Sequence, residues 1–283
     1  MAPQSDADLA RASDPLDLTF SAQELADRRA NVVGFVEESL EQAGVDRAVI
    51  GLSGGVDSST VAAAAVEALG PEAVHGLVMP STVNDDETMS DAERLAERLE
   101  IPYDVLPVAA VVETTAELVP EARDDRMAMG NLRVRARTLV NYYVANHEDA
   151  IVLGTGNRTE ALVGYFTKYG DGAVDCLPLA NLYKQQVRQL ARDLDVPESI
   201  AGRTPTAGMW TGQTDEDELG VEYDTLDSIL ALHVEGGVPA SATAETIGVD
   251  REIVTRVRSL YERSRHKRSM PPGPDRPAHS RSR

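Results

Sequence analysis

Hydrophobic and polar positions follow two different periods along the chain. From Ser21 to Gly44, apolar side chains recur every three or four residues, which predicts a helix that ends at the glycine. A short β-rich run at 48–53 leads into a Gly-Gly turn and an alanine-rich helix over about 57–69. The same alternation continues, with strands expected at 74–80, 103–108 and 150–155, a possible last strand at 174–180, and helices at 85–100, within 109–147, at 182–195 and across 215–262.

Apolar strands that alternate with helices are typical of a parallel sheet covered on both faces. We therefore predict an α/β fold, a doubly wound parallel sheet of about five strands flanked by helices. Ligands of such sheets bind at the carboxyl ends of the strands. We expect a single domain over residues 21–263, after a loose polar segment at 1–20 and before a basic, proline-rich tail at 264–283.

The net charge of the chain limits the kinds of molecule that it can bind. The 283 residues contain 27 Lys+Arg and 47 Asp+Glu, a formal charge of −20, which argues against nucleic-acid binding. Only Lys168, Lys184 and Lys267 are lysines. We interpret this composition as adaptation to a salty cytoplasm, with arginine-favouring codon bias as the alternative. The tail is basic, so it is either a disordered end or a flap attracted to anionic ligands.

The cysteine content and the length of the apolar runs exclude disulfide-rich proteins, cysteine-rich metal sites and membrane-spanning helices. A lone cysteine, Cys176, cannot form an internal disulfide or a cysteine-rich metal site, and we expect it to be buried. The longest apolar runs, such as 61–66, are far shorter than the roughly 20 residues that span a bilayer. The first twenty residues lack the apolar stretch of a secretory signal. We expect a cytoplasmic enzyme with no membrane partner.

The segment 51–59, GLSGGVDSS, joins a predicted strand to a predicted helix. Its glycines, Gly54 and Gly55, allow close backbone approach to a ligand, and the helix N-terminus behind them favours an anion. It is neither a Walker A loop nor a GxGxxG fingerprint. Asp57 would repel a phosphate here unless a divalent cation lay between them, so it predicts Mg²⁺. The alternative is a glycine-rich turn with Asp57 as an ordinary first-turn acid.

The string SGGVDSS resembles the pyrophosphate loop of the ATP pyrophosphatases. Further strings narrow the resemblance to the NAD synthetase family over residues 51–271: GNLRVRAR (130–137), GTGNRTE (154–160), GYFTKYGDG (164–172), LYKQQV (182–187), MWTGQTDEDELG (209–220) and HKR (266–268). The resemblance implies an adenine-nucleotide alpha-hydrolase-like fold and an ATP-dependent, amide-forming ligase. Such an enzyme adenylylates the nicotinate carboxylate of deamido-NAD, and ammonia then displaces AMP to give NAD.

On the nucleotide side, the resemblance implies ATP contacts from Gly51, Leu52, Ser53, Gly54, Gly55, Val56, Asp57, Ser58, Thr155, Lys184 and Thr206. It makes Glu160 the second Mg²⁺ ligand beside Asp57, and Lys184 the cation that neutralises departing pyrophosphate. Asn157 with Glu160 three residues later is also a capping-box pattern, which is the alternative for that acid. A plain loop hydroxyl is the alternative for Thr206.

On the second-substrate side, the resemblance implies deamido-NAD contacts from Arg135, Lys168, Asp175, His266 and Lys267. Because Arg133, Arg135 and Arg137 alternate in sequence, a helix cannot present all three on one face. Asp171 resembles the residue that holds ammonia, with a structural turn aspartate as the alternative. Thr214 and the acids after it indicate a helix N-terminus, to which we give no catalytic role, and Trp210 is either a lid residue or packing.

The nitrogen source and the assembly also follow from the resemblance. Glutamine-using members carry an extra amidase domain for which this chain is too short, so we expect free ammonia. We expect a homodimer, with helices 21–44 and those within 109–147 as interface elements. Two alternatives remain: another ATP pyrophosphatase, such as the synthetase part of GMP synthetase or a tRNA-thiolating enzyme, and a nucleotide sensor that never turns over.

Overall fold

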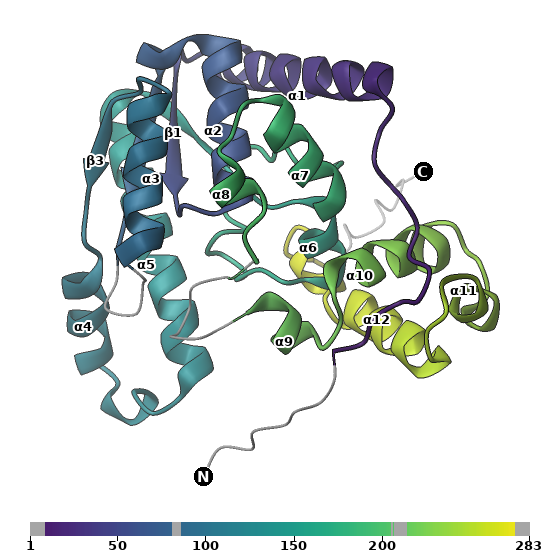
Figure 1. The fold of residues 1–283 in the computed structure, drawn as a ribbon. Coiled ribbons are helices and arrows are strands. Elements are labelled where there is room, and N and C mark those ends of the chain that lie inside the picture. Colours follow the sequence, from purple (N-terminus) through teal and green to yellow (C-terminus); the bar gives the residue numbers. More distant parts are fainter. Residues whose placement is uncertain (1–8, 81–85, 205, 207–213, 275–283) are drawn as a thin grey trace, which may run out of the picture.

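A parallel sheet lies at the centre of the computed structural model, which describes residues 9–80, 86–204, 206 and 214–274. The sheet has four strands in the order β3-β2-β1-β4 (Figure 1). Their bounds are β1 Arg47–Leu52, β2 Val74–Val78, β3 Tyr103–Val105 and β4 Ala150–Leu153. Ile50 of β1 pairs with Gly76 on one side and Leu153 on the other. The predicted doubly wound parallel sheet is confirmed.

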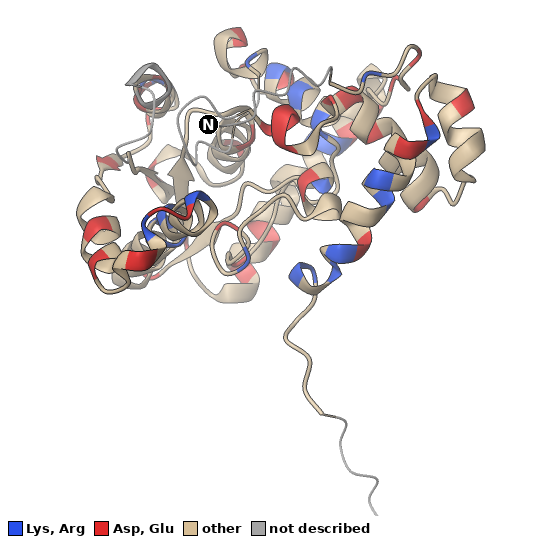
Figure 2. Cartoon of the chain, turned by 90° about the horizontal axis from the view of Figure 1, so that it is seen from below, with Lys and Arg blue, Asp and Glu red and all other residues tan. Residues whose placement is uncertain are grey.

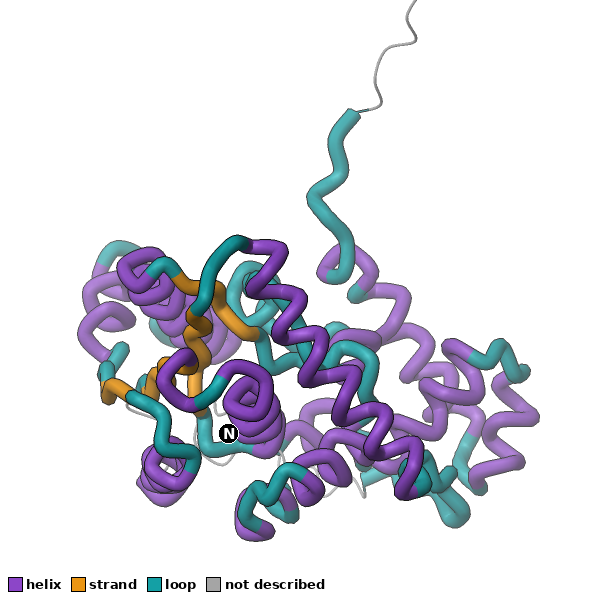
Figure 3. Tube along the Cα trace, turned by 90° about the horizontal axis from the view of Figure 1, so that it is seen from above, coloured by secondary structure: helices purple, strands orange, loops and turns teal. Residues whose placement is uncertain are grey.

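Helices cover both faces of this sheet (Figure 3). One face carries α1 Ala22–Ala43, α2 Val56–Leu69, α3 Asp86–Arg98, α7 Lys184–Asp193 and α8 Glu198–Ala201. The other carries α4 Ala109–Glu117 and α5 Arg126–Glu148. Short 3-10 turns, η1 Pro71–Ala73 and η2 Pro120–Ala122, precede β2 and α5. Among the described residues, no helix is both long enough and apolar enough to cross a bilayer.

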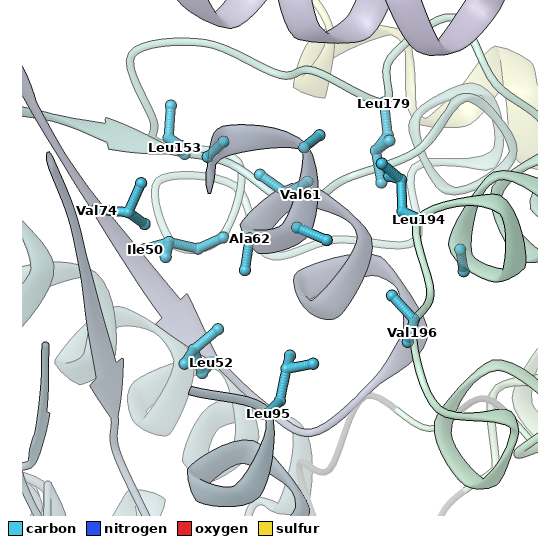
Figure 4. Packing of buried hydrophobic residues seen from close by; sticks show 14 of the residues in the cluster. Ile50, Leu52, Val61, Ala62, Val74, Leu95, Leu153, Leu179, Leu194 and Val196 are labelled. Carbon is cyan, nitrogen blue, oxygen red and sulfur yellow. The ribbon is translucent and has the colours of Figure 1, made fainter. Parts of the chain in front are cut away.

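The core between β1 and α2 is built from branched side chains on the strand and small ones on the helix. Figure 4 shows Ile50 and Leu52 of β1 facing Val61 and Ala62 of α2. The run Ala62–Ala65 is buried, and these small side chains let the helix axis come close to the strands. Close packing here holds the first turn of α2 directly beyond the end of β1.

A second group of helices forms beside the sheet around its own apolar cluster (Figure 1). Its members are α9 Asp215–Leu219, α10 Tyr223–Ile229, the π-helical η3 Leu230–Glu235, α11 Ala240–Ile247, α12 Arg251–Arg263 and the 3-10 turn η4 Arg265–Lys267. The helical prediction for 215–262 is confirmed. Figure 1 shows this group below α7, on the side of the sheet where α6, Arg158–Val163, also lies.

Residues 9–20 run across α10 and α7 before α1 begins. The backbone amide of Ala12 donates to Thr225 Oγ1 at 2.8 Å, that of Leu16 to Ser228 Oγ at 2.9 Å, and that of Phe20 to Gln189 Oε1 at 2.7 Å. This part of the segment expected to be loose is thus bound along its length. It connects the second group of helices to the helices on the sheet.

The expected fifth strand, 174–180, is not a strand. It makes one parallel bridge, between Cys176 and Leu153, with the Gly154 amide donating to the Cys176 carbonyl at 2.9 Å. Pro178 follows and has no amide to donate, and the next residues turn back on themselves through a bond from Ala180 to Leu177. Cys176 is half-buried, and burial raises its pKa.

Candidate active site

A cavity of about 570 Å³ opens where the carboxyl ends of β1 and β4 meet. In the sheet, β2 and β3 lie on one side of β1, and β4 lies on its other side. The position between β1 and β4, where the strand order reverses, is the expected ligand position in a doubly wound sheet. The volume is in the range of small-molecule sites. The lining includes Gly51–Ser58, Asn131, Val134, Arg137, Thr155, Glu160, Gly164–Thr167, Asp171, Lys184, Arg203, Thr204, Thr206, Asp215, Glu218 and Lys267.

The loop after β1 has the backbone that its glycines predict. Gly54 lies at φ 73°, in the left-handed region that glycine adopts without strain, and Gly55 is the N-cap of α2 with no side-chain cap. The hydroxyls of Ser58 and Ser59 donate back to the Gly55 carbonyl, at 3.1 and 2.8 Å. The serines thus fix the bend, and the first-turn amides of α2 are the groups that favour an anion.

A buried lysine joins the two predicted metal ligands. Lys184, 1% exposed at the start of α7, places its Nζ 2.5 Å from Asp57 Oδ2 and 3.1 Å from Glu160 Oε1. Asn157 Nδ2 donates to the other oxygen of Asp57 at 2.8 Å. Residues from α2, α6 and α7 therefore converge on one point, although Asp57 and Lys184 are 127 positions apart in the sequence.

Glu160 is also a helix cap, so its two interpretations are compatible. The Glu160 amide donates to Asn157 Oδ1 at 3.0 Å, and the Asn157 amide donates to Glu160 Oε2 at 3.4 Å. This capping box fixes one carboxylate oxygen on the backbone and leaves the other for Lys184. Cap and cluster use different oxygens of the same side chain.

Charge and burial act against each other in this cluster. Burial alone lowers the pKa of Lys184, but the surrounding carboxylates outweigh it and raise that pKa above its ordinary value. Burial raises the pKa of Glu160, Asp57 raises it further, and Lys184 opposes both. The lysine ammonium stays charged, and its charge is balanced by the acids it contacts.

Two converging carboxylates fit Mg²⁺, which takes one or two protein carboxylates and completes its shell with phosphate oxygens and water. Asp57 and Glu160 already share one cation, the Lys184 ammonium. Within the described part of the chain, no group of three or more His, Cys, Asp or Glu side chains could hold a metal. The donor set therefore suits an ion that arrives with a phosphate ligand rather than a permanently caged one.

Asp215 is an acid in this wall that the sequence analysis missed. Thr214 caps α9 as predicted, and the next residue, 4% exposed, accepts hydrogen bonds from Tyr223 Oη at 2.9 Å and Tyr165 Oη at 3.1 Å. Its charge contributes to the raised pKa of Lys184. A first-turn acid looks the same in sequence whether it faces solvent or a buried lysine.

Arg203 is a second missed residue, beside the glycine bend. It forms an ion pair with the buried Asp91 of α3, and its Nη1 lies 3.5 Å from the Gly54 carbonyl. Thr206 is exposed and lines the same cavity. Trp210 lies outside the described residues.

Four of the five predicted second-substrate residues, all except Asp175, come together near the C-terminal end of the described chain. Lys267 Nζ donates to the carbonyls of Gly164 and Phe166, both at 2.7 Å. Lys168 Nζ donates to the His266 carbonyl at 2.8 Å, and Arg135 Nη2 to the Lys168 carbonyl at 3.1 Å. Figure 2 shows basic residues gathered where the tail leaves the body.

The start of the tail is docked on the body through residues 264–268. Arg268 Nη1 donates to the Leu162 carbonyl at 2.7 Å, and its Nη2 to the Tyr261 carbonyl at 2.6 Å. Gly164, at φ 71°, lies so close to Ser264 that a Cβ would fall 2.1 Å from the serine Cβ. This part of the tail is thus attached as the flap interpretation expects, and 275–283 lie outside the described residues.

The arginines of α5 differ from the expectation, which assigned Arg135 to the second substrate, in which of them lines the cavity. Arg135 is exposed and away from the cavity wall, whereas Arg137 lines the cavity and donates from Nε to the Met79 carbonyl at 3.0 Å. Burial lowers the pKa of Arg137 to about 10. Asp175 accepts from the Val152 amide at 2.7 Å and Tyr142 Oη at 3.1 Å, so it braces β4.

Asp171 combines both of its interpretations. Its Oδ1 accepts the Thr167 amide at 2.7 Å, a turn-stabilising bond, yet the residue lines the cavity and is accessible from it. Desolvation in the cavity wall raises the pKa of Asp171 to about 6, although the hydrogen bond from the Thr167 amide and the charge of Lys267 oppose this shift. A carboxyl group in this range can hold or release a proton near neutral pH.

Comparison with known proteins agrees with this geometry. The family model described as NAD synthase matches residues 29–271. A curated relative, the NH(3)-dependent NAD(+) synthetase of the halophile Halobacterium salinarum, is 56% identical over 260 residues, which cover 92% of this chain and 97% of the relative. This chain belongs to the NAD synthase family. The acidic, lysine-poor composition fits a relative from a halophile.

Solved structures agree on the fold. An NMN synthetase from Francisella tularensis superposes with a TM-score of 0.79 at 36% identity, over 90% of this chain and 99% of that one. An NH3-dependent NAD synthetase from Campylobacter jejuni gives 0.75 at 23% identity, over 89% and 99%. At that lower identity the second likeness speaks for the fold alone.

Proposed function

We propose that this protein is an ammonia-dependent NAD synthetase, an ATP-dependent ligase that converts the nicotinate carboxylate of deamido-NAD into an amide. One observation carries the proposal: a buried lysine contacts Asp57 and Glu160 beside a glycine bend at the switch point of the sheet. That arrangement suits the binding of a polyphosphate and its release as pyrophosphate. The family membership and the Halobacterium salinarum relative support the specific reaction.

In the first step, a carboxylate oxygen of the substrate attacks the α-phosphorus of ATP. The bond from phosphorus to the bridging oxygen breaks, and pyrophosphate leaves towards the Gly54–Gly55 bend. The first-turn amides of α2 and the Lys184 ammonium meet the charge that builds on it. Around this loop, Leu52, Val56, Ser58, Thr155 and Thr206 line the cavity as the remaining ATP contacts.

Asp57 and Glu160 would hold Mg²⁺, which supplies neutralising charge to the phosphate oxygens when bound. The charge balance of the cluster supports this assignment. Lys184 supplies one positive charge to the two carboxylates that it contacts in the structure. With a metal bound by Asp57 and Glu160, the Lys184 ammonium would be available to the departing pyrophosphate.

In the second step, ammonia attacks the carbonyl carbon of the adenylate, the bond from that carbon to the AMP oxygen breaks, and the nitrogen releases one proton to solvent as the amide forms and AMP leaves. Asp171 is proposed to accept a proton from ammonium, because it is accessible from the cavity and has a pKa raised to about 6. Lys267 and Arg137 are placed to attract the anionic groups of the second substrate. Arg135, Lys168, Asp175 and His266 are proposed to contact its outer part.

We also propose a cytoplasmic homodimer. Exposed apolar side chains on α1 and α5, namely Phe35, Leu139 and Tyr143, support the expected interface elements. The name of the Halobacterium salinarum relative supports free ammonia as the nitrogen source.

A second candidate is amidation of a mononucleotide. The Francisella tularensis neighbour is named an NMN synthetase and is 36% identical to this chain. The nicotinate carboxylate is chemically the same in both substrates, so the choice depends on contacts to the distal part of the dinucleotide. We therefore compare both substrates directly in one assay.

The assay mixes ATP, Mg²⁺, ammonium and either deamido-NAD or nicotinate mononucleotide in high salt, with glutamine replacing ammonium as a control. Formation of NAD and AMP from deamido-NAD supports the proposal, and preferential formation of NMN supports the second candidate. AMP without either product points to another ATP pyrophosphatase. Absence of AMP with all substrates points to a nucleotide sensor.

A further inference from the structure

A buried carboxylate lies behind Lys184, on the side away from the cavity. Asp227, in α10, is 0% exposed and is absent from the cavity wall. It comes from the second group of helices, whereas Lys184 belongs to a helix on the sheet. A buried acid carries a desolvation cost, so its contacts need a physical reason.

Both oxygens of Asp227 are used to hold the start of α7. Oδ2 accepts the backbone amide of Gln185 at 3.0 Å, and Oδ1 accepts the hydroxyl of Thr159 at 2.5 Å. The same hydroxyl accepts the backbone amide of Lys184 at 3.0 Å. The first two amides of α7 are thus satisfied, one directly and one through Thr159.

Thr159 also precedes Glu160 in α6, so the network ties the two helices that carry members of the cluster. Its side chain is 0% exposed, and Lys184 is 1% exposed. Because Lys184 is the first residue of α7, its backbone position sets where Nζ can reach. A buried lysine that contacts two carboxylates has little freedom to compensate for a displaced backbone.

We propose that Asp227 and Thr159 are positioning residues that hold Lys184 at the site of pyrophosphate release. Neither residue lines the cavity, and both act through the first turn of α7. The inference deepens the proposed function and rests on it for its kinetic readout. A second readout below does not depend on activity.

The variants remove the hydrogen bonds of the Thr159 hydroxyl, which donates to Asp227 and accepts from the Lys184 amide, or one acceptor oxygen of Asp227. Thr159→Val keeps the side-chain shape but removes the hydroxyl, and Thr159→Ser restores it. Asp227→Asn leaves one acceptor oxygen where two are used. Asp224→Asn is the matched control on the same helix, because the Asp224 side chain is 54% exposed and lies 3.9 Å from Arg188.

In steady-state NAD formation, Thr159→Val and Asp227→Asn should each lower kcat about 10- to 100-fold, with the KM for deamido-NAD within about twofold of wild type. Thr159→Ser should recover most of the loss, and Asp224→Asn should match wild type. In a Lys184→Ala background, Asp227→Asn should change residual ATP–pyrophosphate exchange less than about twofold, since both changes act through one side chain. The inference would be overturned if the separate losses of Lys184→Ala and Asp227→Asn multiplied in the double variant. It would also be overturned if the single variants changed the KM for deamido-NAD as much as kcat.

The chain has three lysines, so selective ¹⁵N labelling of lysine side chains gives three assignable signals. Asp227→Asn and Thr159→Val should shift the Lys184 Nζ signal and leave those of Lys168 and Lys267 in place, whereas Asp224→Asn should shift none. An unmoved Lys184 signal in folded Asp227→Asn protein overturns the positioning role. A wild-type protein that forms no NAD counts instead against the proposed function, and the NMR comparison still decides the inference.

Discussion

The nucleotide half and the second-substrate half of the site hold their positive charges in different ways. On the nucleotide side, Lys184 is paired with Asp57 and Glu160, and Arg203 with Asp91, so each cation contacts a carboxylate. On the second-substrate side, the lysines and Arg135 donate instead to backbone carbonyls, among them those of Gly164 and His266. Carbonyls satisfy hydrogen bonds without cancelling charge.

This difference indicates two ways to receive an anion. Where carboxylates balance the cations, a bound polyphosphate must arrive with its own counter-charge, which suits Mg²⁺ with ATP. Where carbonyls hold the cations, positive charge remains for an anionic ligand, with Asp171 as the nearby acid that acts on Lys267. A protein of charge −20 gains local attraction for a dinucleotide in this way.

The largest expected effect comes from the carboxylate side. Asp57→Asn keeps the size of the side chain but removes the charge that would hold the metal, so ATP–pyrophosphate exchange should fall about 10³-fold or more at saturating Mg²⁺. Asp46→Asn, an exposed acid just before β1, is the matched control and should leave exchange unchanged. Full exchange in the Asp57 variant would remove the metal assignment.

On the second-substrate side, where backbone carbonyls hold the cations, a substitution should mainly change the binding of the substrate. Lys267→Gln removes the cation but retains a donor for the Gly164 and Phe166 carbonyls, so the KM for deamido-NAD should rise about tenfold with a smaller change in the KM for ATP. Arg251→Gln removes an exposed positive charge at the start of α12 and serves as the charge-matched control. Equal changes in both KM values would show that the two halves are not separate.

Asp171 should set the acid limb of the pH profile. Its pKa is raised to about 6, with Lys267 and Arg137 as the charges that interact with it. If it accepts the proton from ammonium, kcat/KM for ammonia should fall about tenfold per pH unit below pH 6. Asp171→Asn should lower the plateau and abolish that limb; a limb that persists in the variant assigns it to another group.

The smallest expected effect is on stability. The contribution of Asp171 to stability should fall as the pH rises, whereas its contribution to activity should increase. The pKa of Asp171 rises from its ordinary value of 3.8 to about 6 on folding, so the native state binds the proton more tightly. The contribution of Asp171 to the free energy of unfolding is therefore greatest below pH 4 and falls as the pH rises through 6, by about 1 kcal/mol after screening by solvent in the cavity. In denaturant titrations across this range, the difference in free energy of unfolding between wild type and Asp171→Asn should change by this amount, because the other titrating groups are common to both proteins.

The sequence predicts the elements of the nucleotide side because its signals are local. The glycine bend, the N-terminus of α2 and the capping box of Asn157 each lie within a few residues, where backbone chemistry decides the structure. Resemblance to a family then placed Lys184 and Glu160 beside Asp57, and the structure brings these side chains together.

Other parts of the site depend on distant contacts that no local pattern carries. Asp215, Arg203 and Arg137 look like ordinary helix or loop charges until packing directs them into the cavity. The expected strand at 174–180 has a strand-like apolar pattern, but Pro178 and the turn after it limit pairing to one bridge. Periodicity describes which side chains are apolar, not which neighbours are available.

The path of residues 9–20 has a consequence for how the molecule is made. Ala12 and Leu16 leave the ribosome long before the residues that they contact. Thr225 follows Ala12 by 213 positions, and Ser228 follows Leu16 by 212. The sheet can assemble during translation, but the second group of helices, and with it Asp227 behind Lys184, can be fastened to this segment only after the residues up to 228 have been made. Nascent protein therefore passes through a stage with a finished sheet and an unfinished catalytic centre.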